Sequence, residues 1–188
     1  MILYNEKIKP ILEDLESPEI ELAGGSTVGM ILSITNSLII YICNLTIGKK
    51  KYEDVQDEVI KIKNEATKIK EIALKVIDED REVLDKILKA YKTRKTSPYK
   101  LEEASKAGVL FCKDVMEKAI QTVELSERIA KVGNKMLSSD FEISRKYAIS
   151  SVEASIVNIE INLKCVNDEN FIKQIREDYS NKIEKIKK

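Results

Sequence analysis

The chain has 188 residues, 43% of them hydrophobic and 34% charged, which suits a single domain, residues 1–188, with one continuous core. Its basic and acidic residues number 32 each, so no net field attracts nucleic acid or an anionic membrane. The absence of histidine excludes Ser-His and Cys-His catalytic pairs and removes the commonest ligand of zinc and copper sites. We therefore expect acid–base chemistry by Asp, Glu, Lys, Tyr or water, and no metal.

The cysteines and the N-terminus indicate the compartment. Cys43, Cys112 and Cys165 are odd in number and far apart, which argues against a disulfide framework and for buried free thiols in a reducing compartment. Residues 1–16 mix both charge signs and lack the hydrophobic run and the cleavage site of a signal peptide. We expect a cytoplasmic protein.

Apolar residues recur at spacings of three and four along nearly the whole chain, which has only three prolines and six glycines. This pattern predicts an all-α fold. The expected helices, in chain order, cover residues 4–15, 26–47, 55–90, 98–133, 139–166 and 168 onward. Because no repeat of fixed period is present, the sequence predicts a single antiparallel bundle of five to six helices.

Several residues mark the expected helix ends. Pro10 is expected to distort the first helix, and Gly48 suits a left-handed cap after the second. Ser97 and Pro98 suit the N-cap and first position of the fourth helix. Residues 139–142, Ser-Asp-Phe-Glu, have the pattern of a capping box that opens the fifth.

The second helix carries no charge between Glu21 and Lys49. Residues 28–47 are long enough to span a bilayer, but six Ser, Thr and Asn residues interrupt them and no second such segment is present. Small residues at positions 25, 29, 33 and 37 form a ridge that lets another backbone approach closely. A helix that is apolar nearly all round is expected to be central, covered by its neighbours and by another subunit, so we expect a homodimer.

The glycine turn before this helix is the first candidate binding site. Gly24, Gly25 and Ser26 lie where unpaired helix amides favour an anion. An ordinary turn with Ser26 as N-cap is the alternative.

Asp80 lies in an otherwise apolar stripe of the third helix. Burial of an unpaired carboxylate is costly, so its position implies a partner, a cavity, or a raised pKa useful for proton transfer. A salt bridge at the end of the core, among neighbours such as Arg81 and Glu82, is the alternative.

Polar residues elsewhere also have two interpretations. On the fifth helix, the amides of Asn158 and Asn162, with two serines before them, would bind ring and amide nitrogens of a ligand or only tie helices together. Asp140 is a candidate site residue or a favourable charge in a first helical turn, and Lys49 either follows a helix C-terminus or helps to hold a polyanionic tail.

Four segments in order resemble the formiminotransferase-cyclodeaminase C-terminal family, whose free-standing members include methenyltetrahydrofolate cyclohydrolases. They read AGGSTVGMILSI, CNLTIGKKKY, VIDEDREVLDKILKAYK, and LSSD followed by SVEASIVNIEINL. The resemblance implies an all-helical homodimer with a folate cleft and a tetrahydrofolate derivative as substrate. The residues that match the family's motifs, and that would form the site, are Gly24, Gly25, Ser26, Asp80, Asp140, Asn158 and Asn162.

The implied function is hydrolysis of 5,10-methenyltetrahydrofolate or the related cyclodeamination of 5-formiminotetrahydrofolate. Asp80 is then the expected general base and Asp140 its electrostatic partner. The alternative from another class is a non-catalytic helical oligomer or scaffold, in which the aspartates are salt-bridged and the glycine turn is empty. A membrane-anchored protein is the third possibility.

Overall fold

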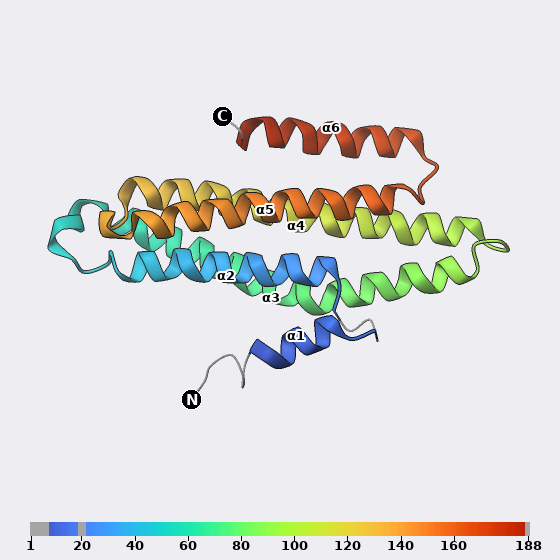
Figure 1. Cartoon of the computed structure of the whole chain (residues 1–188). Coiled ribbons are helices and arrows are strands. Elements are labelled where there is room, and N and C mark those ends of the chain that lie inside the picture. Colours follow the sequence, from blue (N-terminus) through green and yellow to red (C-terminus); the bar gives the residue numbers. More distant parts are fainter. Residues whose placement is uncertain (1–7, 19–21, 187–188) are drawn as a thin grey trace.

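The computed structural model describes residues 8–18 and 22–186 and confirms the all-α prediction. Within these ranges it contains helices and no strand. The helices, shown in Figure 1, are α1 (Lys9–Glu16), α2 (Gly24–Asn44), α3 (Gln56–Lys92), α4 (Pro98–Val132), α5 (Ser138–Leu163) and α6 (Glu169–Ile186), with short 3₁₀ turns η2 (Lys50–Val55) and η3 (Lys135–Leu137).

Helices α2 to α5 form an antiparallel four-helix bundle (Figure 1). Their apolar stripes meet along its axis, where Leu32 and Ile39 of α2, Ile62 of α3, Met116 of α4 and Ile159 of α5 are fully buried. Burial of each such side chain contributes about 1.5–3 kcal/mol. The stripe of α3 is buried through Val76, and the end of α3 and the start of α4 extend beyond α2 as a protruding hairpin.

The uncharged helix is a bundle member with one open side. By length and composition α2 is the one described helix that could cross a membrane, and 56% of its most apolar window is buried inside the bundle. The core helix of a globular bundle has the same character. Its outer side exposes Ile31, Ile34 and Tyr41, so neighbours within the chain do not cover it all round.

The ridge of small residues on α2 faces α3 at one end only. A Cβ at Gly29 would lie 2.9 Å from the carbonyl oxygen of Ala73, so glycine allows the two backbones to touch there. Ser37 is instead exposed and bonds the carbonyl of Ser33 on its own helix. The predicted close approach is therefore confirmed at Gly29, whereas Ser37 faces away from the other helices of the chain.

Two predicted helix starts are wrong. The second helix begins at Gly24, so both glycines belong to its first turn and Ser26 is not its N-cap. The fifth begins at Ser138 without a capping box, because the η3 turn, in which Asn134 accepts the amide of Met136, runs directly into it. Asp140 therefore lies in the first turn of α5, the alternative considered for it.

The other helix ends agree more closely with the sequence. Gly48 has a φ of 75° and provides the left-handed turn after α2, although α2 itself ends at Asn44. Ser97 and Pro98 stand at the predicted N-cap and first position of α4, but the hydroxyl of Ser97 forms no cap hydrogen bond. In α1, Pro10 is in the first turn, and the predicted start at Tyr4 lies outside the described residues.

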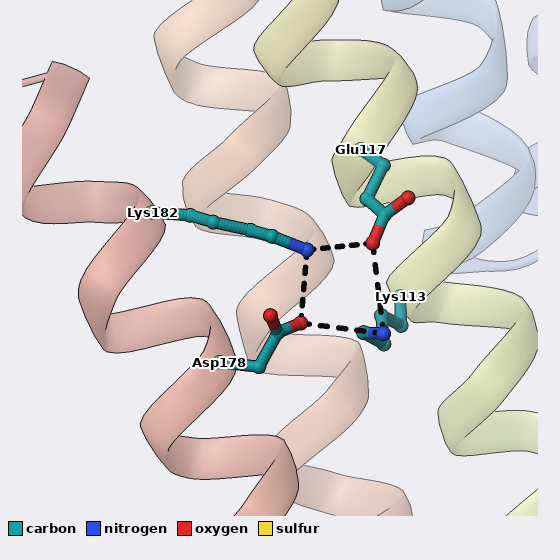
Figure 2. A network of polar contacts seen from close by, with 4 residues as sticks. All are labelled: Lys113, Glu117, Asp178 and Lys182. Carbon is teal, nitrogen blue, oxygen red and sulfur yellow. Dashed lines mark hydrogen bonds and ion pairs between the residues drawn. The ribbon is translucent and has the colours of Figure 1, made fainter.

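Helix α6 lies as an outer layer over α4 and α5 (Figure 1) and inserts Ile175 toward the core. Figure 2 shows how charges fasten it. Lys182 of α6 contacts Glu117 of α4 at 2.6 Å and Asp178 at 2.9 Å, while Lys113 of α4 contacts the same two carboxylates at 3.6 and 3.3 Å. Each charge thus has two opposite neighbours, which holds α6 against the bundle.

Candidate functional site

The N-terminus of α2 meets Asp80 of α3. The amide of Ser26, third residue of the helix, donates to Asp80 Oδ2 at 2.9 Å, and the Ser26 hydroxyl lies 3.1 Å from the same oxygen. That hydroxyl is also 3.0 Å from the carbonyl oxygen of Ile77. The anion expected at the glycine turn is therefore present within the chain, and it is the Asp80 carboxylate.

Gly25 makes this contact sterically feasible. A Cβ added there would overlap the carboxyl group of Asp80, closer than real Cβ atoms come to any neighbour. Gly24 is different, because its added Cβ would meet only Asn158 Oδ1, at 3.6 Å, an ordinary contact distance. Asp80 therefore requires glycine at position 25 and not at position 24.

Burial raises the pKa of Asp80, and the hydrogen bonds from the amide and hydroxyl of Ser26 oppose that rise. Among the described residues Asp80 takes part in no ion pair, and Ser26 is its hydrogen-bond partner instead. The position of Asp80 in an apolar stripe implied a partner, a cavity or a raised pKa, and the structure has all three: Ser26 as the partner, an adjoining cavity, and a raised pKa. A half-buried carboxylate whose pKa is raised suits proton transfer.

A cavity of about 110 Å³ lies beside this carboxylate, between the start of α2, the middle of α3 and the end of α5. Asn158 and Asn162 are among its lining residues. The Asn162 amide also donates to the carbonyl of Asn158 at 3.0 Å and lies 3.8 Å from Cys112 Sγ. The two serines before them, Ser151 and Ser155, bond carbonyls of their own helix instead.

Several residues that line or support the cavity were not identified as site residues from the sequence, among them Cys112, Ile161 and Gly108. Cys112 and Ile161 line the cavity, and neither stands out from its neighbours in the sequence. Gly108 supports it, because a Cβ there would lie 2.9 Å from Ile87 and 3.3 Å from the Asn162 amide. A glycine in the middle of a long helical pattern was the available signal.

Of the three free thiols, Cys112 lines the cavity beside Asp80, whereas Cys43 lies near the other end of α2. Burial and the negative charge of Asp80 raise the pKa of Cys112 to about 12, and burial raises that of Cys43 to about 12. Both are buried free thiols, as predicted, while Cys165 is half-buried. Within the described ranges no three Cys, Asp or Glu side chains are grouped to hold a metal ion.

Lys49 and Asp140 lie at the opposite end of the bundle. Asn158 is 18 positions after Asp140 on α5, so about 27 Å separates them along the helix. The Lys135 amide donates to the Tyr52 hydroxyl, which joins the turn before α5 to the loop after α2. A second cavity there, of about 420 Å³, is lined by Gly48, Lys49, Lys50, Glu53 and Gln56. The structure thus unites six of the eight predicted site residues, and the other two lie elsewhere.

Known proteins resemble this chain over nearly its whole length. A family profile described as formiminotransferase-cyclodeaminase matches residues 7–181. The chain is 27% identical over 180 residues to a methenyltetrahydrofolate cyclohydrolase of Methylorubrum extorquens, covering 90% of this chain and 85% of that protein. The fold matches the crystal structure of formiminotetrahydrofolate cyclodeaminase from Thermotoga maritima with a TM-score of 0.90 and 26% identity, over 96% of this chain and 89% of that one.

Proposed function

The chain belongs to the formiminotransferase-cyclodeaminase family, as its sequence segments predicted, and from this premise we propose that it hydrolyses 5,10-methenyltetrahydrofolate to 10-formyltetrahydrofolate. Its homologues are cyclohydrolases and cyclodeaminases that act on tetrahydrofolate derivatives. The observation that carries the proposal is the Asp80 carboxylate, held by Ser26 at the edge of a cavity with two asparagine amides.

The substrate carries a cationic carbon that bridges N5 and N10. The negative charge of Asp80 stabilises this cation, and its carboxylate accepts a proton from the water that attacks the carbon. The resulting tetrahedral adduct opens by breaking the bond to N5, which takes up a proton, while the formyl group stays on N10. One proton is released to solvent, so the net reaction is cation plus water giving the neutral formyl product and a proton.

The other site residues have supporting roles in this proposal. Ser26 is a positioning residue, since its amide and hydroxyl hold Oδ2 of Asp80. Asn158 and Asn162 offer amide donors and acceptors to the pterin ring. Gly25 makes room for the Asp80 carboxylate, and Gly24 lets the substrate approach the backbone at the start of α2.

Cyclodeamination of 5-formiminotetrahydrofolate is the second candidate. There N10 attacks the formimino carbon and ammonia leaves, a step that requires a proton donor. The raised pKa of Asp80 favours this candidate, because a carboxyl group that keeps its proton to higher pH can deliver it to the leaving nitrogen.

We place the enzyme in the cytoplasm as a homodimer that needs no metal.

The test supplies each folate in turn to the purified protein. We expect the near-ultraviolet absorbance of 5,10-methenyltetrahydrofolate to fall faster than its spontaneous hydrolysis. Formation of the same absorbance from 5-formiminotetrahydrofolate would instead identify a cyclodeaminase. If neither substrate reacts and no folate analogue raises the melting temperature, the protein is a scaffold.

A further inference from the structure

The end of α3 and the start of α4 form a hairpin that protrudes from the bundle (Figure 1). Helix α3 ends at Lys92, residues 93–97 form the turn, and α4 begins at Pro98. No residue from 81 to 100 is buried, whereas the apolar stripe of α3 is buried through Val76. The end of this hairpin is therefore accessible to a large partner.

The charge of this end has one sign. The segment 86–100, which we call the basic tip, contains no Asp or Glu and has six cations, Lys86, Lys89, Lys92, Arg94, Lys95 and Lys100. All six are exposed. The net charge of the whole chain is zero and gave no reason to expect an anionic partner, but the charges are unevenly distributed. A local positive field of this kind attracts polyanions.

Carboxylates of the chain do not neutralise the basic tip. Among the described residues none of its six cations takes part in an ion pair. The next cation along α4, Lys106, lies 3.4 Å from Glu102 and 2.8 Å from Asp168. Arg94 donates from Nη1 to the carbonyl of Tyr91 at 2.9 Å, a neutral acceptor that leaves its charge uncompensated. The charge of the tip is thus available to a partner.

Helix stability explains only part of this charge. Lys89 and Lys92 lie in the last turn of α3, where cations interact favourably with the helix dipole. Lys100 lies in the first turn of α4, where acidic residues are the favourable ones and none is present. A lysine at that position, like Arg94 and Lys95 in the turn, requires another explanation.

Two exposed tyrosines stand among the cations. Tyr99 is 60% exposed and Tyr91 is 46% exposed. The guanidinium of Arg94 lies 3.8 Å from the centroid of the Tyr91 ring, so cation and ring are stacked. Flat rings among cations suit a nucleic-acid strand, because bases stack on the rings while phosphates contact the cations.

We propose that the basic tip binds single-stranded nucleic acid, with its lysines and Arg94 on the phosphates and Tyr99 stacked on a base. The tyrosines favour this occupant over an acidic peptide, whose carboxylates leave the rings unused. A membrane surface is disfavoured, because the tip exposes no large apolar residue except Leu88 and the two tyrosines. This binding goes beyond the proposed function and involves no reaction on folate.

The first test is fluorescence anisotropy of a labelled oligouridylate and of the matching oligothymidylate, each about 12 nucleotides long. We expect a Kd on the order of 10⁻⁵ M at about 50 mM salt. With about four phosphates contacted, the affinity should fall roughly 50-fold between about 50 and 200 mM salt. Tighter binding of one oligomer identifies RNA or DNA as the source. No binding of either at about 10⁻⁴ M protein, the weak limit of non-specific binding, overturns the proposal.

Two triple variants locate the site. The tip variant carries the changes Lys89→Gln, Lys92→Gln and Lys95→Gln. The control carries the same change at exposed positions of α3 outside the tip, Lys61→Gln, Lys68→Gln and Lys75→Gln. Glutamine has nearly the helix propensity of lysine, so both should fold, which circular dichroism checks. We expect the tip variant to lose at least about 10-fold in affinity and to depend less on salt, while the control matches the wild type. Equal losses in the two variants contradict the assignment to the tip.

The third comparison separates nucleic acid from other anionic partners. Tyr99→Phe keeps the ring, whereas Tyr99→Leu removes it and keeps an apolar side chain. We expect Tyr99→Phe to bind the oligouridylate as the wild type does and Tyr99→Leu to bind it about 5- to 150-fold more weakly, the range for one lost base stack.

Three results would overturn the choice of partner. Equal affinity of the two Tyr99 variants would show that no base stacks on this ring. Equal displacement of the labelled strand by polyglutamate and by unlabelled oligouridylate would indicate an acidic chain bound through charge alone. Tighter binding to phosphatidylserine vesicles than to either oligomer would indicate a membrane surface.

Discussion

Substitution of the two glycines at the start of α2 separates steric support of Asp80 from helix propensity. In either position alanine gains up to about 1 kcal/mol in the helix relative to glycine. At Gly24 the new methyl group makes an ordinary contact, whereas at Gly25 it overlaps the Asp80 carboxyl group. The matched pair Gly24→Ala and Gly25→Ala therefore differs mainly in whether Asp80 keeps its position.

The magnitude follows from the bonds that Gly25→Ala breaks. Displacement of the carboxylate removes both hydrogen bonds from Ser26, a fully buried residue, and leaves its amide without that acceptor. Leaving the buried amide of Ser26 without an acceptor lowers the free energy of unfolding by about 1–3 kcal/mol. Rehydration of the displaced carboxylate offsets part of the loss of its own hydrogen bonds. With the propensity gain included, we expect a net destabilisation of about 1–2 kcal/mol.

The assay is thermal unfolding of both variants beside the wild type. For a chain of this size about 1–2 kcal/mol lowers the melting temperature by about 2–8 °C. Gly24→Ala should match the wild type or exceed it slightly. If Gly25→Ala melts at or above Gly24→Ala, Asp80 is not held against the first turn of α2 and the site geometry is refuted.

Three further outcomes are expected. Ser26→Ala removes a hydroxyl bond that lowers the pKa of Asp80, so the acid limb of the pH–rate profile should move to higher pH; movement to lower pH would contradict the role of Ser26. Native protein should react with a thiol reagent at pH 8 mainly through half-buried Cys165 and at all three cysteines once denatured, because burial raises the pKa of the other two to about 12; fast reaction at three thiols in the native state would be inconsistent with their burial. Lys182 holds the pKa of Glu117 low. Burial would raise the pKa of Asp178, but hydrogen bonds from Lys182 and Lys113 outweigh it and hold that pKa low as well. The two ionised carboxylates therefore stabilise the fold at pH values above their unfolded-state pKa, and this stabilisation is lost as the pH falls through their lower folded-state pKa values. Asp178→Asn should therefore cost about 0.5–1 kcal/mol at pH 7, less in high salt, and flatten the acid decline in melting temperature; an unchanged melting curve would show that the network does not fasten α6.

The periodicity of apolar residues predicted the fold well. The existence of α2 and α3 was predictable because the spacing of apolar residues along the chain determines which side of a helix is buried. The starts of α2 and α5 were predicted less well, because contacts made elsewhere in the chain determine them. Asp80 supplies an acceptor to the first turn of α2 from 54 residues away, and the η3 turn feeds α5 without a side-chain cap.

The candidate site was predictable where a residue contradicts its surroundings. A carboxylate in an apolar stripe and two glycines before an uncharged helix both indicated this place. Cys112 and Ile161 gave no such signal, since each suits a helix interior or an apolar face equally well. The separation of Asp140 from Asn158 and Asn162 followed from their positions at opposite ends of one predicted helix. That Asp80 lies at the asparagine end and Lys49 at the other end required the packing of the bundle.

The most direct test of the central claim is the rate of 5,10-methenyltetrahydrofolate loss above the spontaneous rate, with wild type and Asp80→Asn side by side. Asparagine can still accept the Ser26 amide and carries no buried charge, so the variant should fold and melt at or above the wild type. We predict a wild-type acceleration that Asp80→Asn reduces by about 10²–10⁴-fold, the usual contribution of a general base. An Asp80→Asn variant that hydrolyses the substrate as fast as the wild type would contradict the assignment of Asp80 as the base.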